Sequence, residues 1–133
     1  MTHEEPVPLI KEFINAALGR KAKDLVILDV RELTSFTDLF MICSGKSNRQ
    51  VSAIAEHIRR DMKKKGIAPL SVEGLKDGQW VLLDYGHMLV HIFLEPVREF
   101  YDLEGFWSNA PRIAIEDYVD LSEITEKSGA AES

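Results

Sequence analysis

The sequence predicts an α/β fold, a single compact domain in which helices flank a mixed β-sheet. Its 133 residues suffice for one hydrophobic core. Segments with apolar residues at helical spacing alternate with short runs of strand-favouring residues, as in small α/β domains. Two of these runs are joined by Gly86-His87, a pair typical of a tight hairpin turn. Because the sequence contains no internal repeat, nothing indicates a second domain.

Composition excludes several classes of protein. The chain is 45% hydrophobic and 29% charged, as ordinary globular domains are, so collagen-like and wholly disordered chains are excluded. No apolar run approaches the roughly 18 residues of a membrane-spanning helix, and the acidic start resembles neither a secretory signal nor a transit peptide. The single cysteine, Cys43, lies in an apolar run and is expected to be a buried structural thiol. We therefore expect a cytoplasmic protein that makes no contact with membranes.

The first half of the chain predicts a helix followed by two buried strands. Apolar residues at helical spacing, with Pro8 before them and Gly19 after them, predict a helix over residues 8–19. Short apolar runs rich in strand-favouring residues predict strands over residues 25–30 and 38–44.

A second helix is predicted to start after Ser47, since Ser47 and Gln50 can cap a helix reciprocally, and to end near Gly66. Residues 46–65 hold seven basic side chains against two acidic ones, although the whole chain has a net charge of −6. The three lysines at 63–65 suit the dipole at a helix C-terminus, yet they could also bind RNA phosphates. Both interpretations stay open, whereas the acidic balance of the whole chain argues against binding to DNA.

The clearest predicted feature is a hairpin with strands over residues 80–85 and 88–94, preceded by an edge strand over residues 69–72. In the register that its turn sets, one side of the hairpin is wholly apolar or aromatic and is expected to face the core. The other side pairs Trp80 with Phe93, Leu82 with His91, and Asp84 with Leu89. This mixed side is expected either to be covered by a helix or to be offered to a partner.

A last helix is predicted over residues 97–104, with Gly105 as its C-terminal cap and Trp107 returning to the core. Helical spacing places Val97, Phe100, Tyr101 and Glu104 on one face of it. Residues 116–133 hold six acidic side chains against one basic one. We therefore predict a domain over residues 1–115 and an acidic, flexible C-terminal tail over residues 116–133.

No pattern in the sequence predicts a catalytic or metal site, so we expect no catalytic residue, no metal and no cofactor. Gly45-Lys46-Ser47 resembles the end of a phosphate-binding loop, but Phe40 stands where that motif requires a glycine. A helix cap or a site for a small anion fits this segment. The four histidines show no ligand spacing with each other or with Cys43. His91 is expected to be a structural histidine that can bond Asp84, with a partner contact or a catalytic base as alternatives.

Four segments in the second half of the chain resemble the Iojap family, whose bacterial members are called ribosomal silencing factors. These segments are Glu73-Gly74, residues 80–86, residues 90–93 and residues 98–107. Further matching positions are Asp24, Asp29, residues 36–40 and residues 47–51. The resemblance covers roughly residues 5–112, so the acidic tail lies outside it. His87 departs from the family, which usually has an acidic residue after the Tyr-Gly of the turn.

The resemblance implies a function as well as a fold. The fold is nucleotidyltransferase-like but lacks the active site of true nucleotidyltransferases. The implied partner is the large ribosomal subunit, bound through ribosomal protein L-fourteen on the face that meets the small subunit. Occupying that face sterically blocks association of the subunits and represses translation when nutrients are scarce. In the family, the tryptophan of the hairpin and the apolar residues beside it contribute to the contact with this ribosomal protein. The resemblance assigns that contact here to Trp80, Val81 and Leu82.

The hairpin and the helix after it are therefore the predicted partner-binding surface. Its residues are Trp80, Val81, Leu82, Asp84, Tyr85, His91, Phe93, Arg98, Glu99 and Tyr101. The acidic side chains of this region are expected to meet a basic partner surface. The alternatives are a nucleotidyltransferase-like enzyme and a general RNA-binding module. A homodimer and an incidental contact with ribosomal RNA are further expectations, since an apolar face without a partner often pairs with itself.

Overall fold

Six strands form one mixed sheet at the centre of the structure, a computed structural model that describes residues 9–119. The strands lie in the order β3-β4-β5-β2-β1-β6. Along the chain the elements are α1 (Ile10–Leu18), β1 (Lys23–Asp29), β2 (Leu39–Gly45), α2 (Asn48–Lys64), β3 (Ser71–Glu73), β4 (Trp80–Asp84), β5 (Met88–Leu94), α3 (Glu95–Tyr101), α4 (Leu103–Phe106), β6 (Arg112–Ile113) and the 3₁₀ turn η1 (Ile115–Asp117). Strands β2 and β5 are parallel, and the other neighbours are antiparallel. The predicted mixed α/β fold is confirmed, while its likeness to nucleotidyltransferases stays a prediction.

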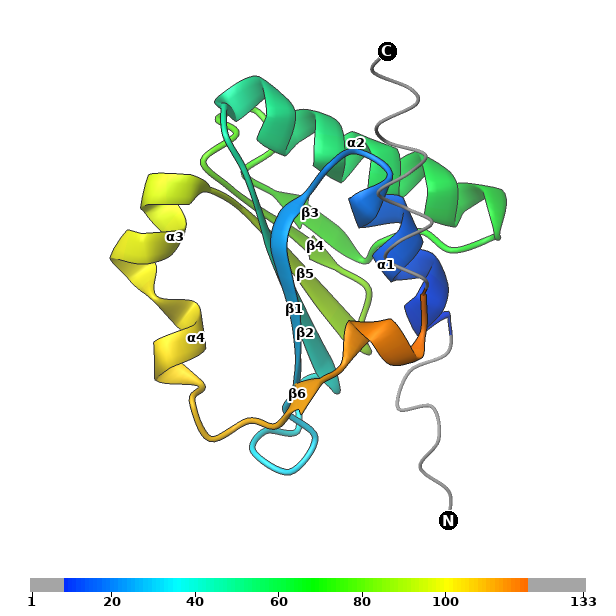
Figure 1. Cartoon of the computed structure of the whole chain (residues 1–133). Coiled ribbons are helices and arrows are strands. Elements are labelled where there is room, and N and C mark those ends of the chain that lie inside the picture. The colour runs from blue at the N-terminus through cyan, green and yellow to red at the C-terminus, as the bar shows by residue number, and fades with distance from the viewer. Residues whose placement is uncertain (1–8, 120–133) are drawn as a thin grey trace.

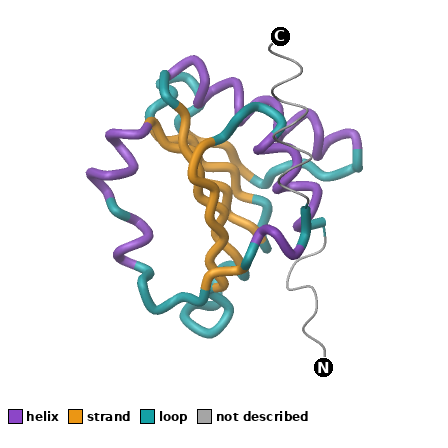
Figure 2. The backbone as a smooth tube through the Cα atoms, in the orientation of Figure 1, coloured by secondary structure: helices purple, strands orange, loops and turns teal. Residues whose placement is uncertain are grey.

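Helices cover both faces of the sheet and divide its apolar side chains into two clusters (Figure 1). The larger cluster lies between the sheet and the pair α1 and α2, and the smaller one lies under α3 and α4. Figure 2 shows the strands enclosed between these two groups of helices. All seven residues of β2 are buried, because this strand is covered on both faces. Within residues 9–119, no helix has the length and apolar content needed to cross a membrane.

The hairpin has the predicted register and turn. Val81 pairs with Ile92 and Leu83 pairs with Val90, so the wholly apolar side faces the larger cluster. Gly86 has a φ of +87°, which a glycine adopts without strain. The turn is also held from outside the hairpin, because the Thr37 hydroxyl donates to the carbonyl of Gly86 at 2.9 Å.

Helix α2 begins as predicted, with a small difference in how it is capped. The Ser47 hydroxyl accepts a hydrogen bond from the amide of Gln50 at 3.1 Å. The Gln50 side chain accepts from the amide of Lys46 at 2.7 Å, one residue further back than in a reciprocal capping box. Two amides near the helix start are thus used internally, which favours the helix cap over an anion site as the interpretation of this segment.

The last helix differs from its prediction because Asp102 breaks it. Asp102 adopts a left-handed conformation with φ of +47°, and its carboxylate accepts from the amide of Gly105 at 3.2 Å. A side chain at Gly105 would overlap this carboxylate, so Gly105 lies inside a new short helix, α4, and does not cap the preceding one. Val97, Phe100 and Tyr101 all lie on α3 before the break, where Val97 packs on the sheet and the other two side chains are exposed.

Ordered packing continues past the predicted end of the domain. Strand β6, which the sequence did not predict, pairs with β1, and Val119 packs into the larger cluster with 8% exposure. The ordered domain therefore includes residues 116–119, which the sequence placed in the flexible tail. The rest of that predicted tail, residues 120–133, lies outside the described residues, as do Pro8 and the residues before it.

Candidate functional site

A continuous band of aromatic rings crosses the face of the sheet that α3 and α4 cover. We call the following nine residues the aromatic band: Phe36, Phe40, Trp80, His91, Phe93, Phe100, Tyr101, Phe106 and Trp107. Neighbouring rings in the band have centroids 4.8 to 6.5 Å apart. Its middle is buried, but its two ends are not. Phe100 and Tyr101 are 80% and 53% exposed at one end, and Phe106 and Phe36 are 81% and 62% exposed at the other.

Such exposure is unusual for aromatic side chains. Within residues 9–119, six large hydrophobic side chains are exposed, and four of these belong to the band. Scattered apolar residues on a surface are ordinary, whereas a contiguous apolar patch marks a binding surface. Aromatic side chains are also the ones that contribute most energy at protein interfaces. The exposed ends of the band are therefore the best candidate for a contact surface.

Trp80 connects the buried and exposed parts of the band. Its ring lies 4.9 Å from that of Tyr101, and its indole N–H donates to Nδ1 of His91 at 3.1 Å. Burial lowers the pKa of His91 to about 4, so the imidazole is neutral at pH 7 and carries its proton on Nε2. His91 is thus a structural histidine that orients Trp80. The predicted bond to Asp84 is wrong, because the Asp84 carboxylate accepts from the amide of Gly86 instead.

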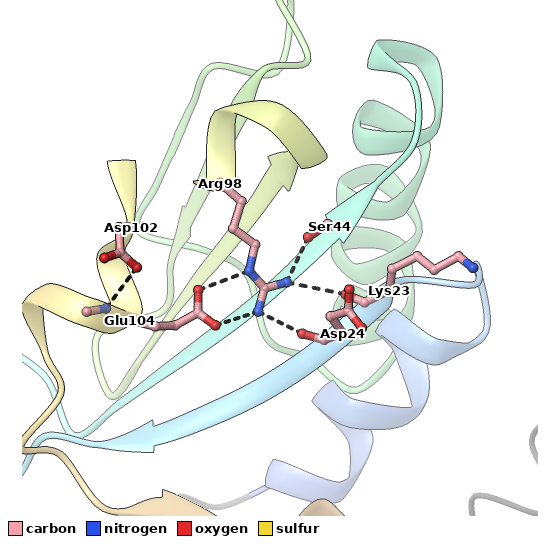
Figure 3. A network of polar contacts seen from close by, with 7 residues as sticks. Lys23, Asp24, Ser44, Arg98, Asp102 and Glu104 are labelled. Carbon is pink, nitrogen blue, oxygen red and sulfur yellow. Dashed lines mark hydrogen bonds and ion pairs between the residues drawn. The ribbon is translucent and has the colours of Figure 1, made fainter. Parts of the chain in front are cut away.

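The two short helices that carry the exposed rings are held by Arg98 (Figure 3). Its guanidinium binds Glu104 of α4 through two bonds of 3.0 and 2.8 Å. It also donates to the buried hydroxyl of Ser44 at 2.7 Å and to the carbonyls of Lys23 and Asp24. These bonds connect α3 and α4 to β1 and β2. The hydrogen bonds that Glu104 accepts from Arg98 lower the pKa of Glu104 below its usual value, which keeps the carboxylate charged.

Arg98 was predicted to contact a partner, and the structure assigns it an internal role instead. All five N–H groups of the guanidinium have partners within the chain, and the side chain is only 11% exposed. Glu104, an acidic side chain of the same region, is held by two of these bonds. Both residues position the contact surface without forming it.

Burial or position on the opposite face separates four other residues from the predicted surface. Val81 and Phe93 are fully buried, and His91 is 5% exposed, so none of them can contact a partner in this structure. Tyr85 lies on the opposite face of the sheet, where its ring meets the edge of Phe13 at 4.9 Å. Burial raises the pKa of its hydroxyl to about 12.

The remaining predicted residues agree with a surface position. Trp80 and Tyr101 lie together at one end of the band, and Glu99 is exposed on α3. Leu82 and Asp84 are half-buried on the same strand as Trp80. The sequence missed Phe36 and Phe106, and it gave no contact role to Phe100. An N-capping residue type at 102, three positions before Gly105, is the signal that could have revealed the break and hence the exposure.

Charge on this side of the molecule is mainly acidic. An open hollow of about 500 Å³ beside α3 is lined by Asp24, Ser44, Glu95, Arg98, Glu99, Asp102 and Glu104. Five of these seven residues are acidic, and the single basic one is already paired. No group of three or more metal-ligating side chains within residues 9–119 could hold a metal ion. The surface thus combines exposed aromatic rings with negative charge, which suits a basic protein partner.

Comparison with known proteins gives consistent results. Residues 3–133 match the family described as "Ribosomal silencing factor during starvation", so the match includes the tail that the resemblance left out. A ribosomal silencing factor of Haemophilus influenzae is 41% identical over 98 residues, covering 73% of this chain and 96% of the relative. That of Halalkalibacterium halodurans is 34% identical over 111 residues, covering 84% and 95%. A crystal structure from Chromobacterium violaceum is 38% identical with a TM-score of 0.75, covering 78% of this chain and 87% of the other.

Proposed function

Because this chain belongs to the family of ribosomal silencing factors, we propose that its aromatic band docks on ribosomal protein L-fourteen of the large ribosomal subunit. Membership of the family makes the chain a regulator of translation that associates with ribosomes. The choice of L-fourteen as the contact follows from the resemblance of this chain's hairpin and terminal helix to the Iojap family. We propose further that the bound protein blocks association with the small subunit sterically and that it acts in the cytoplasm.

The single observation that supports this proposal is the pair of exposed rings on α3, Phe100 and Tyr101. Burying a large apolar side chain contributes roughly 1.5 to 3 kcal/mol, and Phe100 is 80% exposed in the free protein. Most of that energy is therefore available to a partner. Trp80, whose ring lies 4.9 Å from Tyr101, extends the same surface to the hairpin.

The surrounding charge supports a basic partner and makes a long RNA a poor occupant of this surface. Glu95, Glu99 and Asp102 line the hollow beside α3, the helix that carries the exposed Phe100 and Tyr101. Carboxylates attract the basic surface of a ribosomal protein and repel the phosphates of RNA. The band therefore favours protein docking over the general RNA-binding function that the sequence left open.

A protein that blocks subunit association sterically must be rigid, and it needs no catalytic step. The bonds of Arg98 to Ser44, Glu104 and two backbone carbonyls fix α3 and α4 to the sheet. A partner that docks on these helices is thus held against the whole domain. The family is that of a regulatory protein.

Binding to purified large subunits and to isolated L-fourteen tests the proposal. The informative variant is Phe100→Ala combined with Tyr101→Ala, since both side chains are exposed and their loss leaves the core intact. Trp80→Ala is less clear, because it also removes the bond to His91. Leu70→Ala is the matched control, a large hydrophobic side chain that is 75% exposed outside the band.

We expect the double variant to lose on the order of 100-fold in affinity for both partners, as each lost anchor costs about 1.4 kcal/mol or more. The control should bind like the wild type. If the double variant folds and binds both partners normally, the band is not the contact surface. Sedimentation of the free protein tests the expected homodimer, which would cover the same rings and dissociate when the large subunit is added.

A further inference from the structure

The outward face of α2 carries a row of basic side chains. The helix buries Val51, Ile54, Ala55, Ile58 and Met62 against the sheet. With 100° between successive residues, positions 49, 60, 63 and 64 lie on the opposite side. We call Arg49, Arg60, Lys63 and Lys64 the basic stripe, and all four are exposed. It extends over about 22 Å, because fifteen steps of 1.5 Å separate its ends.

The charges of the stripe are not neutralised by neighbours. None of its four residues forms an ion pair or a side-chain hydrogen bond with another residue in the range 9–119. The two acidic residues of α2 are both engaged elsewhere. Glu56, on the same outward side of the helix, pairs with Arg59 at 3.2 Å, and Asp61 contacts the imidazole of His57 at 3.3 Å, which balances its charge only when the imidazole is protonated. The stripe therefore presents four positive charges in a chain whose net charge is −6.

The helix dipole explains only part of this arrangement. Cations are favoured in the last turn, where Lys63 and Lys64 lie. Arg49 lies in the first turn, where the dipole disfavours a cation and where this helix has no acidic residue. Arg60 lies before the last turn. Local stability thus accounts for the two lysines, whereas the two arginines call for another explanation.

We propose that the basic stripe binds the phosphate backbone of RNA. The stripe lies across the sheet from the aromatic band, since α2 covers one face and α3 and α4 cover the other (Figure 1). The proposal rests on the proposed function in one respect, namely that ribosomal RNA is the RNA within reach of a protein docked on a ribosomal protein. One molecule thereby holds a protein with one face and RNA with the other.

Phosphates fit the stripe better than a membrane surface does. A helix that lies on a membrane needs exposed apolar side chains, and α2 contributes none of the exposed large hydrophobic residues. Duplex nucleic acid carries about one phosphate charge per 1.7 Å of its axis, so a row of about 22 Å meets several of them. The acidic residues near α3 lie on the other side of the sheet, and salt screens charges separated by more than about 8 Å.

The test measures how salt weakens binding of the full chain to a short RNA duplex. The variant combines Arg60→Gln, Lys63→Gln and Lys64→Gln, which keep good helix formers at exposed positions. Each lost phosphate contact lowers the slope of log affinity against log salt by about 0.9. Between about 50 and 200 mM salt, the wild type should therefore lose on the order of 40-fold more affinity than the variant.

A control variant with the same loss of charge, combining Lys23→Gln, Lys76→Gln and Arg112→Gln, should keep the slope of the wild type. The proposal is overturned if the stripe variant keeps that slope, if the control lowers it equally, or if an acidic peptide competes as well as RNA does. Arg60→Gln alone replaces the triple variant if the latter unfolds, and it should lower the slope by about 0.9, which is about 3.5-fold in affinity between about 50 and 200 mM salt.

Binding to isolated L-fourteen separates this proposal from the proposed function. The stripe variant should bind L-fourteen like the wild type, because the stripe and the aromatic band lie on different faces. If the wild type fails to bind L-fourteen while RNA binding depends on the stripe, the proposed function falls and the RNA site stands. If L-fourteen binds and RNA does not, the reverse holds.

Discussion

Replacing Arg98 should destabilise the domain far more than replacing an arginine of similar chemistry on the surface. Arg98→Met keeps most of the side-chain volume and removes five hydrogen bonds. It leaves the carboxylate of Glu104 and the buried hydroxyl of Ser44 without these donors. Ser44 is 1% exposed, so water cannot easily replace the lost bond.

The expected size follows from burial. Removing one partner of a buried ion pair costs about 3 to 5 kcal/mol, and an exposed pair is worth about 0 to 1 kcal/mol. The side chains of Arg98 and Glu104 are 11% and 21% exposed, so the pair is partly buried and its cost lies at the lower end of the range for buried pairs. We therefore expect a loss of about 3 kcal/mol, a large share of the roughly 5 to 15 kcal/mol by which domains are stable.

The matched control is Arg31→Met. Arg31 also binds a carboxylate through two bonds, to Asp29, but it is 34% exposed and joins residues two apart in sequence. Its loss should cost less than about 1 kcal/mol. Urea unfolding at pH 7 distinguishes the two variants. The free energy of unfolding falls by about 2 kcal/mol per M of urea, so a loss of about 3 kcal/mol lowers the unfolding midpoint by about 1.5 M.

A second variant tests the same pair through pH. The pKa of Glu104 lies below its usual value of 4.5, mainly because of the hydrogen bond from Arg98. Its contribution to stability is therefore present above pH 4.5 and is lost as the pH falls through the lower folded value. Glu104→Gln should be less stable than the wild type at pH 7 and should lack this part of the acid dependence. If Arg98→Met and Glu104→Gln unfold at the urea midpoint of the Arg31→Met control, the tether does not hold α3 and α4.

Three further predictions concern the core and the turns. Burial lowers the pKa of His91 from 6.5 to about 4, so the wild type should lose about 3 kcal/mol of stability as the pH falls from 6.5 towards 4. His91→Gln should abolish this loss in urea unfolding. A variant with the same dependence of stability on pH as the wild type would refute this role of His91. Gly86→Ala should cost about 1 to 2 kcal/mol for its φ of +87° alone, whereas Gly74→Ala should cost more, since its Cβ would also overlap the carbonyl oxygen of Trp80; equal unfolding midpoints would contradict this order. Burial raises the pKa of Cys43 to about 12, so a thiol reagent at pH 8 should modify it only in denaturant, and fast modification of the native protein would show that the thiol is accessible.

Much of the fold could be predicted because local patterns and burial agree there. The hairpin turn at Gly86 sets a register in which every residue of one side is apolar, and only one register does that. The cap at Ser47 and the apolar stripe behind it likewise define α2 from neighbouring residues alone. In these segments, local preference and tertiary packing favour the same structure.

The candidate site was harder to predict because it depends on contacts between distant residues. Arginine is a residue type usually found on the surface, and only the fold brings the carbonyl of Asp24 and the hydroxyl of Ser44 within reach of Arg98. Phe100 and Tyr101 fit a helical packing face by spacing, but α3 ends at Tyr101, and the two side chains are 80% and 53% exposed there. Exposure of apolar residues is set by what covers them, and spacing along a helix does not contain that information.

The most direct test of the account is association of the two ribosomal subunits in the presence of the wild type, of the Phe100→Ala and Tyr101→Ala double variant, and of the Leu70→Ala control. Light scattering or gradient sedimentation reports the fraction of joined subunits at each concentration of protein. The account predicts that the wild type and the control prevent joining at similar concentrations, and that the double variant requires on the order of 100-fold more, in proportion to its lost affinity. A folded double variant that blocks joining as well as the wild type would contradict the claim that the aromatic band is the functional surface.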